Sequence, residues 1–230
     1  MISKKNNPIK NDQSFNLDEV KTFLKAIKGN MYEVYFKLIL AYQFSRLELM
    51  SLEWQDIDFE NDTITICPVS YVVLNKFYYS WHIEKLTELK REFPLLPNIK
   101  KLLIELKEQQ EINLEENGND ENINFVCLKK NGTRMNVNTL SRNIRYLCRD
   151  NNLPPILLSG LKLSLEGFIC NQARDYDYYR AWTRFDHKFN RPKNIYNGYN
   201  LFRNKRFVTA LNNLLEGSQM DRKSKSDMEM

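Results

Sequence analysis

Three arginines near the middle of the chain recur with the spacing of one helix face. Arg142, Arg145 and Arg149 stand at positions i, i+3 and i+7, so they are expected to line the outer side of a helix over about 138–149. Guanidinium groups aligned in this way can contact the phosphates of a nucleic acid backbone. A solvated helix face without a ligand is the alternative, and the spacing alone leaves it open.

A second basic tract runs from Arg174 to Arg206 and holds nine Lys or Arg against three Asp. The net charge of the whole chain is only +5, and residues 105–121 are acidic, so the distribution of charge matters more than its total. Aromatic and Asn residues are interleaved with the cations, a pattern that favours a surface for a polyanion. Five cations flank His187 and are the candidate contacts in this tract: Arg180, Arg184, Lys188, Arg191 and Lys193.

Common enzyme signatures are missing from the sequence. It contains no Gly-rich phosphate loop and no G-x-S-x-G motif, and its two histidines, His82 and His187, cannot form a His-rich metal site. The four cysteines are separated by 60, 21 and 22 residues, which matches no zinc, redox or disulfide spacing. We therefore expect reduced thiols, no metal and no cofactor.

The elements that must position these residues are mostly helical. The 230 residues are 42% apolar, enough for a sizeable core. Helical patterns span, approximately, 17–28, 31–42, 46–53, 98–114, 138–149, 158–172, 176–185 and 205–215. Alternating patterns predict a hairpin over 57–66 and further strands near 70–83 and 90–94. The predicted fold class is mainly α with a small antiparallel β-sheet (α+β), without the alternation typical of a parallel sheet.

The chain is predicted to hold one folded domain over 16–215, after a flexible leader over 1–15 and before a charged, disordered tail over 216–230. Asn16 and Glu19 form a capping-box pattern that should start the first helix at Leu17. The longest apolar runs are far shorter than the roughly 20 residues that span a bilayer, so we expect no membrane segment. The basic N-terminus is followed by no apolar stretch, which predicts a cytoplasmic protein without a secretory signal.

Residues 45–59 carry the most specific pattern, S-R-L-E-L-M-S-L-E-W-Q-D-I-D-F. This segment resembles the first catalytic box of the tyrosine recombinases (the phage-integrase family), in which Arg, two residues and Glu are followed by an apolar helix stripe, Trp and Asp-Ile-Asp. The order of the downstream segments also fits, and the resemblance covers about 17–200. It implies the fold of the family's catalytic domain, without the separate N-terminal domain that closes around DNA.

The resemblance implies covalent chemistry that needs neither metal nor cofactor. In the family a tyrosine attacks the scissile phosphodiester and forms a 3′-phosphotyrosyl link, while cations hold the phosphate oxygens. Tyr196 occupies the position of the nucleophile, nine residues after His187, which resembles the histidine of the third box. Lys85 matches the hairpin lysine that protonates the leaving 5′-oxygen, and Lys90 is the alternative in a shifted register.

The sequence departs from the family pattern at four positions. Ser45 stands where the first box has its arginine, and the neighbouring Arg46 is offset by about 100° around the helix. The second box, His-x-x-Arg in the family, is here Ser159-Gly160-Leu161-Lys162, and Lys162 keeps a charge but lacks the planar fork that holds two phosphate oxygens. Asp186 replaces the glycine before His187.

We therefore expect a DNA-binding, integrase-like protein of site-specific recombination whose strand cleavage is impaired. Catalysis would require Arg46 to swing into place or a partner subunit to lend an arginine. The alternative is a non-catalytic regulator or interaction module that reuses the scaffold. The expected partners are double-stranded DNA and, on it, another recombinase subunit or further copies of this chain. The helix over 205–215 could pack in cis or dock on a neighbour.

Overall fold

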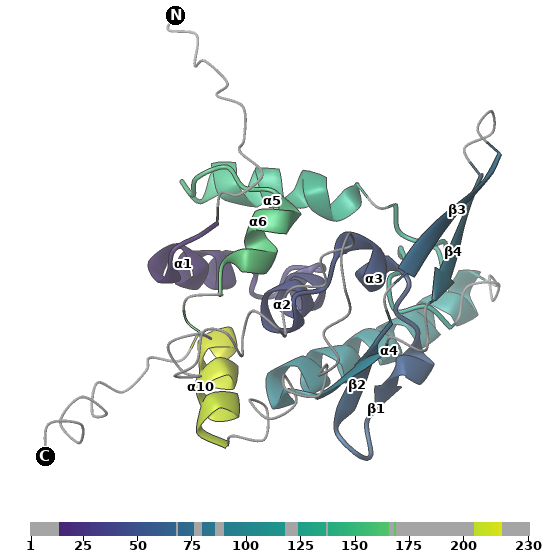
Figure 1. Cartoon of the computed structure of the whole chain (residues 1–230), viewed down its shortest axis with the longest axis horizontal. Helices are drawn as coiled ribbons and strands as arrows, with labels where there is room; N and C mark the ends of the chain where they lie inside the picture. The colour runs from purple at the N-terminus through teal and green to yellow at the C-terminus, as the bar shows by residue number, and fades with distance from the viewer. Residues whose placement is uncertain are drawn as a thin grey trace, which may run out of the picture.

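The computed structural model of the chain describes residues 14–67, 69–75, 80–85, 90–117, 124–136, 138–165, 168 and 205–217, and over 69–85 it describes the backbone only. Helices dominate this part of the chain (Figure 1). They are α1 (Leu17–Ile27), α2 (Glu33–Tyr42), α3 (Arg46–Met50), the short 3₁₀ turn η1 (Trp54–Asp56), α4 (Pro97–Asn117), α5 (Thr139–Asp150), α6 (Leu158–Leu163) and α10 (Lys205–Glu216).

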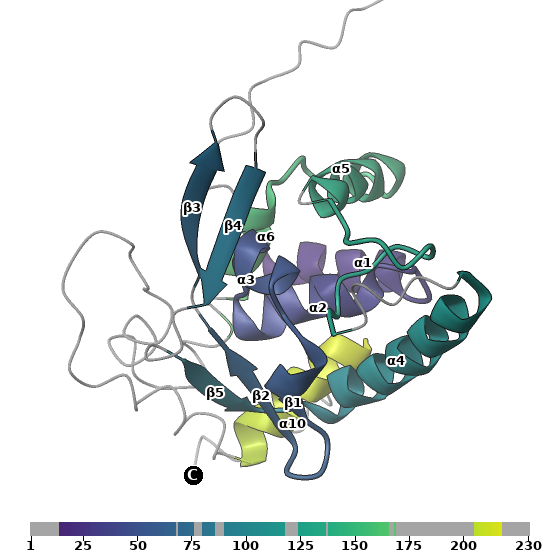
Figure 2. The same cartoon turned by 90° about the vertical axis from the view of Figure 1, so that its right-hand side faces the viewer.

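The strands form two small antiparallel sheets. They are β1 (Ile57–Asp58), β2 (Thr63–Ile66), β3 (Val69–Asn75), β4 (Ser80–Lys85) and β5 (Arg91–Pro94). The first sheet has the order β1-β2-β5, with Ile66 opposite Arg91, and the second pairs β3 with β4. Figure 2 shows the β3–β4 hairpin projecting away from the helices. The predicted class, mainly helical with a small antiparallel sheet, is confirmed.

Helix α1 begins where its capping box predicts. The Asn16 side chain accepts hydrogen bonds from the backbone N–H of Asp18 and of Glu19, and the Glu19 carboxylate accepts one from Asn16 N. These contacts satisfy the N–H groups that the first helical turn leaves without a backbone partner. The helix ends before Gly29, whose φ of +73° is a left-handed conformation that glycine adopts without strain.

Helix α2 is the central element of the core. All ten of its residues are buried, and it packs against α3, α4 and α6 (Figure 1). Its one buried cation, Lys37, lies 2.6 Å from Glu33 and 2.7 Å from the Asn98 side chain. A helix that is apolar on all sides needs neighbours all round, which explains why the other helices surround it.

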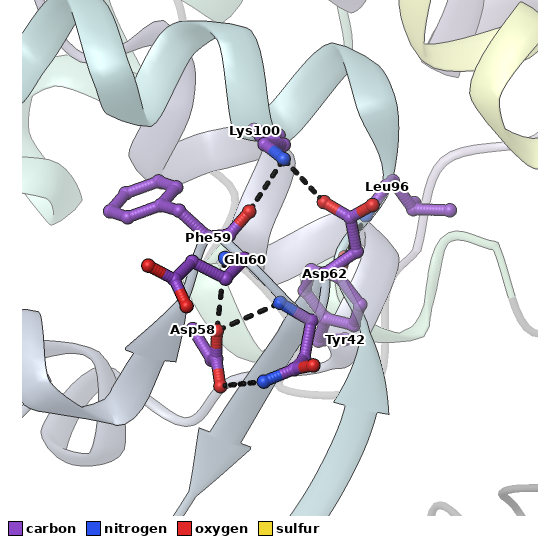
Figure 3. A network of polar contacts seen from close by, with 8 residues as sticks. Tyr42, Asp58, Phe59, Glu60, Asp62, Leu96 and Lys100 are labelled. Carbon is purple, nitrogen blue, oxygen red and sulfur yellow. Dashed lines mark hydrogen bonds and ion pairs between the residues drawn. The ribbon is translucent and has the colours of Figure 1, made fainter.

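The β1–β2 turn is fastened to α4 by one lysine (Figure 3). Lys100 Nζ donates to the Phe59 carbonyl at 2.7 Å and pairs with Asp62 at 2.6 Å. Within the turn, the Asp58 carboxylate accepts hydrogen bonds from the Asn61 side-chain amide and from the backbone N–H groups of Asn61 and Glu60, and these bonds lower its pKa. The turn is therefore held both from inside and from α4.

Three predicted helix boundaries were wrong, and one predicted helix lies outside the described residues. Helix α3 stops at Met50 instead of continuing to 53, because the next residues bond to a distant segment: Val126 N donates to Leu52 O and Trp54 N to Asn124 O. Helix α4 runs on to Asn117, and α6 ends at Leu163 although 158–172 was predicted; 166, 167 and 169–172 lie outside the described residues. The predicted helix over 176–185 is the one outside.

Helix α10 packs in cis against α1 and α4. Its apolar side, with Phe207, Leu211 and Leu214, is buried. The Asn212 side chain accepts a hydrogen bond from Asn98 N at the start of α4. Of the two alternatives that the sequence left open for this helix, the described structure contains the contact within the chain.

Candidate functional site

The start of α3 is built by Ser45, the residue that stands where the family pattern has arginine. Ser45 Oγ accepts a hydrogen bond from Glu48 N at 3.2 Å, and the Glu48 carboxylate accepts one from Ser45 N at 2.7 Å. The pattern Ser-x-x-Glu is a capping box, and it explains why serine suits this position locally. Ser45 is thus the N-cap of α3 and contributes no cation.

Glu48 also binds an arginine that comes from the sheet. Arg91, the first residue of β5, places Nη2 2.6 Å from Glu48 Oε1, and each side chain is only 8% exposed. Burial lowers the pKa of Arg91, while the attraction of Glu48 opposes that shift. The sequence predicted a strand here but no role for Arg91, because ion pairing between a strand and a distant helix leaves no pattern in a single sequence.

A third charged residue, Lys162 on α6, belongs to the same cluster. Removal from water lowers the pKa of Lys162, the carboxylate of Glu48 opposes this shift, and the positive charge of Arg91 adds to it. These three residues come from α3, β5 and α6, and α2 packs against both helices. We call Glu48, Arg91 and Lys162 the Glu48 cluster. Glu48 and Arg91 are buried in it, and Lys162 is half-buried.

Arg46 points toward a different element. Its side chain is exposed, and Nη1 lies 3.4 Å from Oδ1 of Asn138, the residue that precedes α5. The offset of one residue from position 45 therefore directs Arg46 to the surface, whereas Glu48 is buried. Arg46 thus contacts the residue that precedes α5, and no contact between Arg46 and the Glu48 cluster is among those of the described residues.

Helix α5 presents the predicted arginine face. Arg142, Arg145 and Arg149 are exposed, and Leu140 and Ile144 on the other side are buried. Arg149 differs from the other two because its Nε donates to the Asp150 carboxylate at 2.8 Å. Its guanidinium also lies over the ring of Tyr146, with 5.2 Å between the guanidinium carbon and the ring centroid.

The C-terminal end of α3 is held by an arginine that sequence reasoning did not single out. Arg134 donates from Nη2 to the Met50 carbonyl at 2.7 Å. Its guanidinium carbon lies 3.8 Å from the centre of the Phe125 ring, which is the geometry of a cation–π contact. This contact joins α3 to the segment after α4.

The remaining candidates are placed only in part. Lys85 is the last residue of β4, in the projecting hairpin, and its side chain is not described. His187 and Tyr196 lie outside the described residues, as do five of the predicted DNA contacts. Those five are Arg180, Arg184, Lys188, Arg191 and Lys193.

Within the described ranges, no three His, Cys, Asp or Glu side chains are grouped as metal ligands. None of the helices in those ranges has the length and apolar character to cross a bilayer. Cys67, Cys127 and Cys148 are buried free thiols. Burial raises the pKa of the Cys148 thiol to about 11, which favours its protonated form.

Comparison with known proteins identifies the fold. No protein-family model and no curated protein sequence matches the chain. Among solved structures, XerA recombinase is similar with a TM-score of 0.53 and 14% identity over 78% of this chain. The Tn1549 transposon integrase in complex with a circular intermediate DNA gives 0.58 and 15% over 100% of the chain. XerH site-specific recombinase, bound to its palindromic difH substrate in a post-cleavage complex, gives 0.51 and 13% over 88%.

The chain therefore has the fold of tyrosine recombinase catalytic domains, as the first-box pattern predicted. It spans 56% of the XerA recombinase chain, 68% of the Tn1549 integrase chain, which there comprises residues 82–397 of that protein, and 51% of the XerH chain. The similarity is one of backbone arrangement, because the identities do not exceed 15% in these three comparisons.

Proposed function

We propose that this protein binds double-stranded DNA through a tyrosine-recombinase-like domain and that its ability to cleave strands is impaired. The observation that carries the proposal is the Glu48 cluster. In it Glu48, from the segment that resembles the first box, pairs with Arg91 at 2.6 Å. The charges of both influence the pKa of Lys162, from the segment that resembles the second box. Helix α5, with its exposed arginines, packs against α6 beside it. Solved structures with this fold include recombinases bound to DNA, which supports the same partner here.

The proposed chemistry follows from the residues that match the family. The Tyr196 oxygen forms a bond to the scissile phosphorus, its proton passes to a neighbouring base or to water, and the bond to the 5′-oxygen breaks. Lys85 protonates that leaving oxygen, while His187 and Lys162 hold the phosphate oxygens. Arg46 would join them only by leaving Asn138.

Impairment is proposed because two guanidinium positions are altered, to Ser45 and to Lys162. The loss of one preorganised donor to a developing oxyanion costs about 10²- to 10³-fold in rate, so two independent losses would cost on the order of 10⁴- to 10⁶-fold. Binding is affected far less, since phosphate contacts require only positive charge and donors in suitable places.

Duplex binding measured against salt concentration tests the proposed DNA affinity. We expect log K to fall linearly with log salt, with a slope of about −0.9 for each phosphate neutralised. A flat plot would remove DNA as a partner. Incubation with a nicked suicide duplex tests cleavage: we expect little covalent adduct, and any adduct should vanish in Tyr196→Phe. Rapid and complete adduct formation would contradict the impairment.

A regulator that reuses the scaffold is the second candidate. It is favoured by the role of Ser45, because a residue that caps α3 supplies no charge for a phosphate. Co-purification with an intact recombinase, together with no DNA affinity of the chain alone, would identify this function in place of the first.

A further inference from the structure

Arg91 and Ser45, the residue that stands where the family pattern has arginine, contact the same side chain. One carboxylate, Glu48, accepts from Arg91 Nη2 at 2.6 Å through Oε1 and from Ser45 N at 2.7 Å through Oε2. The guanidinium of Arg91 and the backbone of Ser45 therefore occupy the two oxygens of the same group. The backbone from which an arginine side chain at position 45 would extend, and the guanidinium that strand β5 supplies, thus contact the same carboxylate.

The surroundings of Arg91 suit an anion. Arg91 is paired with Glu48 at 2.6 Å. The half-buried Lys162 is near enough for Glu48 to raise its pKa and for Arg91 to lower it, although burial lowers that pKa most. The guanidinium carries five N–H donors in a rigid planar fork, a geometry that matches the oxygens of a phosphate as well as those of a carboxylate. The Glu48 contact fixes the orientation of the fork, which reduces the conformational entropy that binding would otherwise cost.

We propose that Arg91 is a phosphate-binding residue which, from strand β5, replaces the guanidinium missing at position 45 and contacts one backbone phosphate of DNA together with Lys162. This inference rests on the proposed DNA-binding function and adds a residue to that site. It assigns Glu48 a positioning role, because Glu48 holds the arginine without touching the phosphate.

The test compares salt dependence of duplex binding in variants with matched references. Neutralising Arg91 alone would leave Glu48 buried without this cation, so Glu48→Gln/Arg91→Gln is compared with Glu48→Gln, each first shown to be folded by circular dichroism. We expect the double variant to bind about tenfold more weakly at fixed salt and its slope to shrink by about 1, the loss of one phosphate contact. Lys101→Gln, on exposed α4, is the control and should leave the slope unchanged.

A gain-of-contact variant makes the inference specific. Ser45→Arg in the Arg91→Gln background restores a guanidinium next to Glu48, so it should return the slope toward that of the wild-type protein. Ser45→Gln in the same background also removes the N-cap oxygen but adds no charge, so it should leave the slope as low as in Arg91→Gln. A role of Arg91 in folding alone would lower the unfolding temperature of Arg91→Gln without changing the slope.

The outcomes separate this inference from the function on which it rests. Absence of DNA binding by the wild-type chain would overturn both. Normal wild-type binding together with an unchanged slope in folded Arg91→Gln would overturn only the role of Arg91. Failure of Ser45→Arg to change the slope in a folded protein would overturn the equivalence of the two positions.

Discussion

The Tyr42 hydroxyl accepts a hydrogen bond from Leu96 N at 2.8 Å and thereby ties the end of α2 to the junction between β5 and α4. The same hydroxyl donates to the Pro94 carbonyl at 3.0 Å, so one side chain satisfies two backbone groups on either side of Leu95. Burial raises the pKa of Tyr42 well above its usual value, so the hydroxyl stays a donor. Because β5 begins at Arg91, this contact also fixes the strand that delivers Arg91.

Tyr42→Phe should lower the free energy of unfolding by about 1–3 kcal/mol, because it leaves a buried backbone N–H without its acceptor. The ring itself stays in place, so the change isolates the hydroxyl. Urea unfolding of the two proteins measures the difference. Tyr146→Phe is the matched control, since Tyr146 is 51% exposed and should change stability little. Equal losses in the two variants would contradict the bridging role.

Ser45→Ala and Glu48→Gln should differ in cost although both damage the same capping box. The first removes the N-cap oxygen, for which about 1 kcal/mol is typical. The second also leaves the buried Arg91 without its carboxylate, and breaking a buried ion pair in this way costs about 3–5 kcal/mol. Denaturant titration of both variants measures the loss in the free energy of unfolding. If Glu48→Gln loses as little as Ser45→Ala, the pair with Arg91 contributes little to stability.

The residues that the sequence could predict are those whose partners are close in the chain. The Asn16 capping box and the arginine face of α5 depend on spacings of three to seven residues, and both are present. Ser45 shows the limit of this approach. Its capping box was just as readable from Ser-x-x-Glu, but the family pattern drew attention to the missing arginine instead.

The Glu48 cluster could not be predicted, because each partner comes from a different element. Arg91 and Glu48 are 43 residues apart, and only the packing of β5 beside α3 brings them together. The early end of α3 has a similar cause, since Leu52 O accepts a hydrogen bond from Val126 N. Local helix propensity does not include a contact with so distant a segment. Pairing between distant segments decides such features, and spacing along the chain does not show which distant residues pair.

The arginines of α5 should contribute unequally to DNA binding. Arg142 and Arg145 are exposed, whereas Arg149 is paired with Asp150 and lies over Tyr146. Replacing Arg142 or Arg145 by Gln should reduce the slope of log K against log salt by about 1 each. Arg149→Gln should reduce it less, because Asp150 already offsets that charge. A larger loss for Arg149→Gln than for Arg145→Gln would contradict this order.

The double variant Arg149→Gln/Asp150→Asn supplies the control for that comparison. It removes both members of the pair and leaves the net charge of α5 unchanged. If Asp150 is what weakens the contribution of Arg149, this variant should bind duplex DNA about as well as the wild-type chain. Weaker binding would mean that Arg149 contacts DNA directly in spite of its partner.

Alkaline pH should change stability and DNA binding in opposite directions through Lys162. Its pKa in the folded chain lies below the usual 10.5, because partial burial and the charge of Arg91 disfavour the ammonium form and Glu48 only partly compensates. In the window just below pH 10.5 the unfolded chain therefore binds more protons at this residue than the folded chain. The contribution of Lys162 to the free energy of unfolding must then rise with pH.

In the same window the folded protein loses the charge that would face a phosphate, so DNA affinity should fall as pH rises. Lys162→Met keeps the length of the side chain but cannot titrate, and both effects should be absent from it. The measurement is the difference between wild-type and Lys162→Met in urea unfolding and in duplex affinity, each at pH 8 and at pH 10. Taking differences removes the opposite contribution of buried Tyr35 and Tyr42, whose raised pKa values make the folded state lose stability at high pH. If stability and affinity moved in the same direction, Lys162 could not be both desolvated in the fold and in contact with the phosphate.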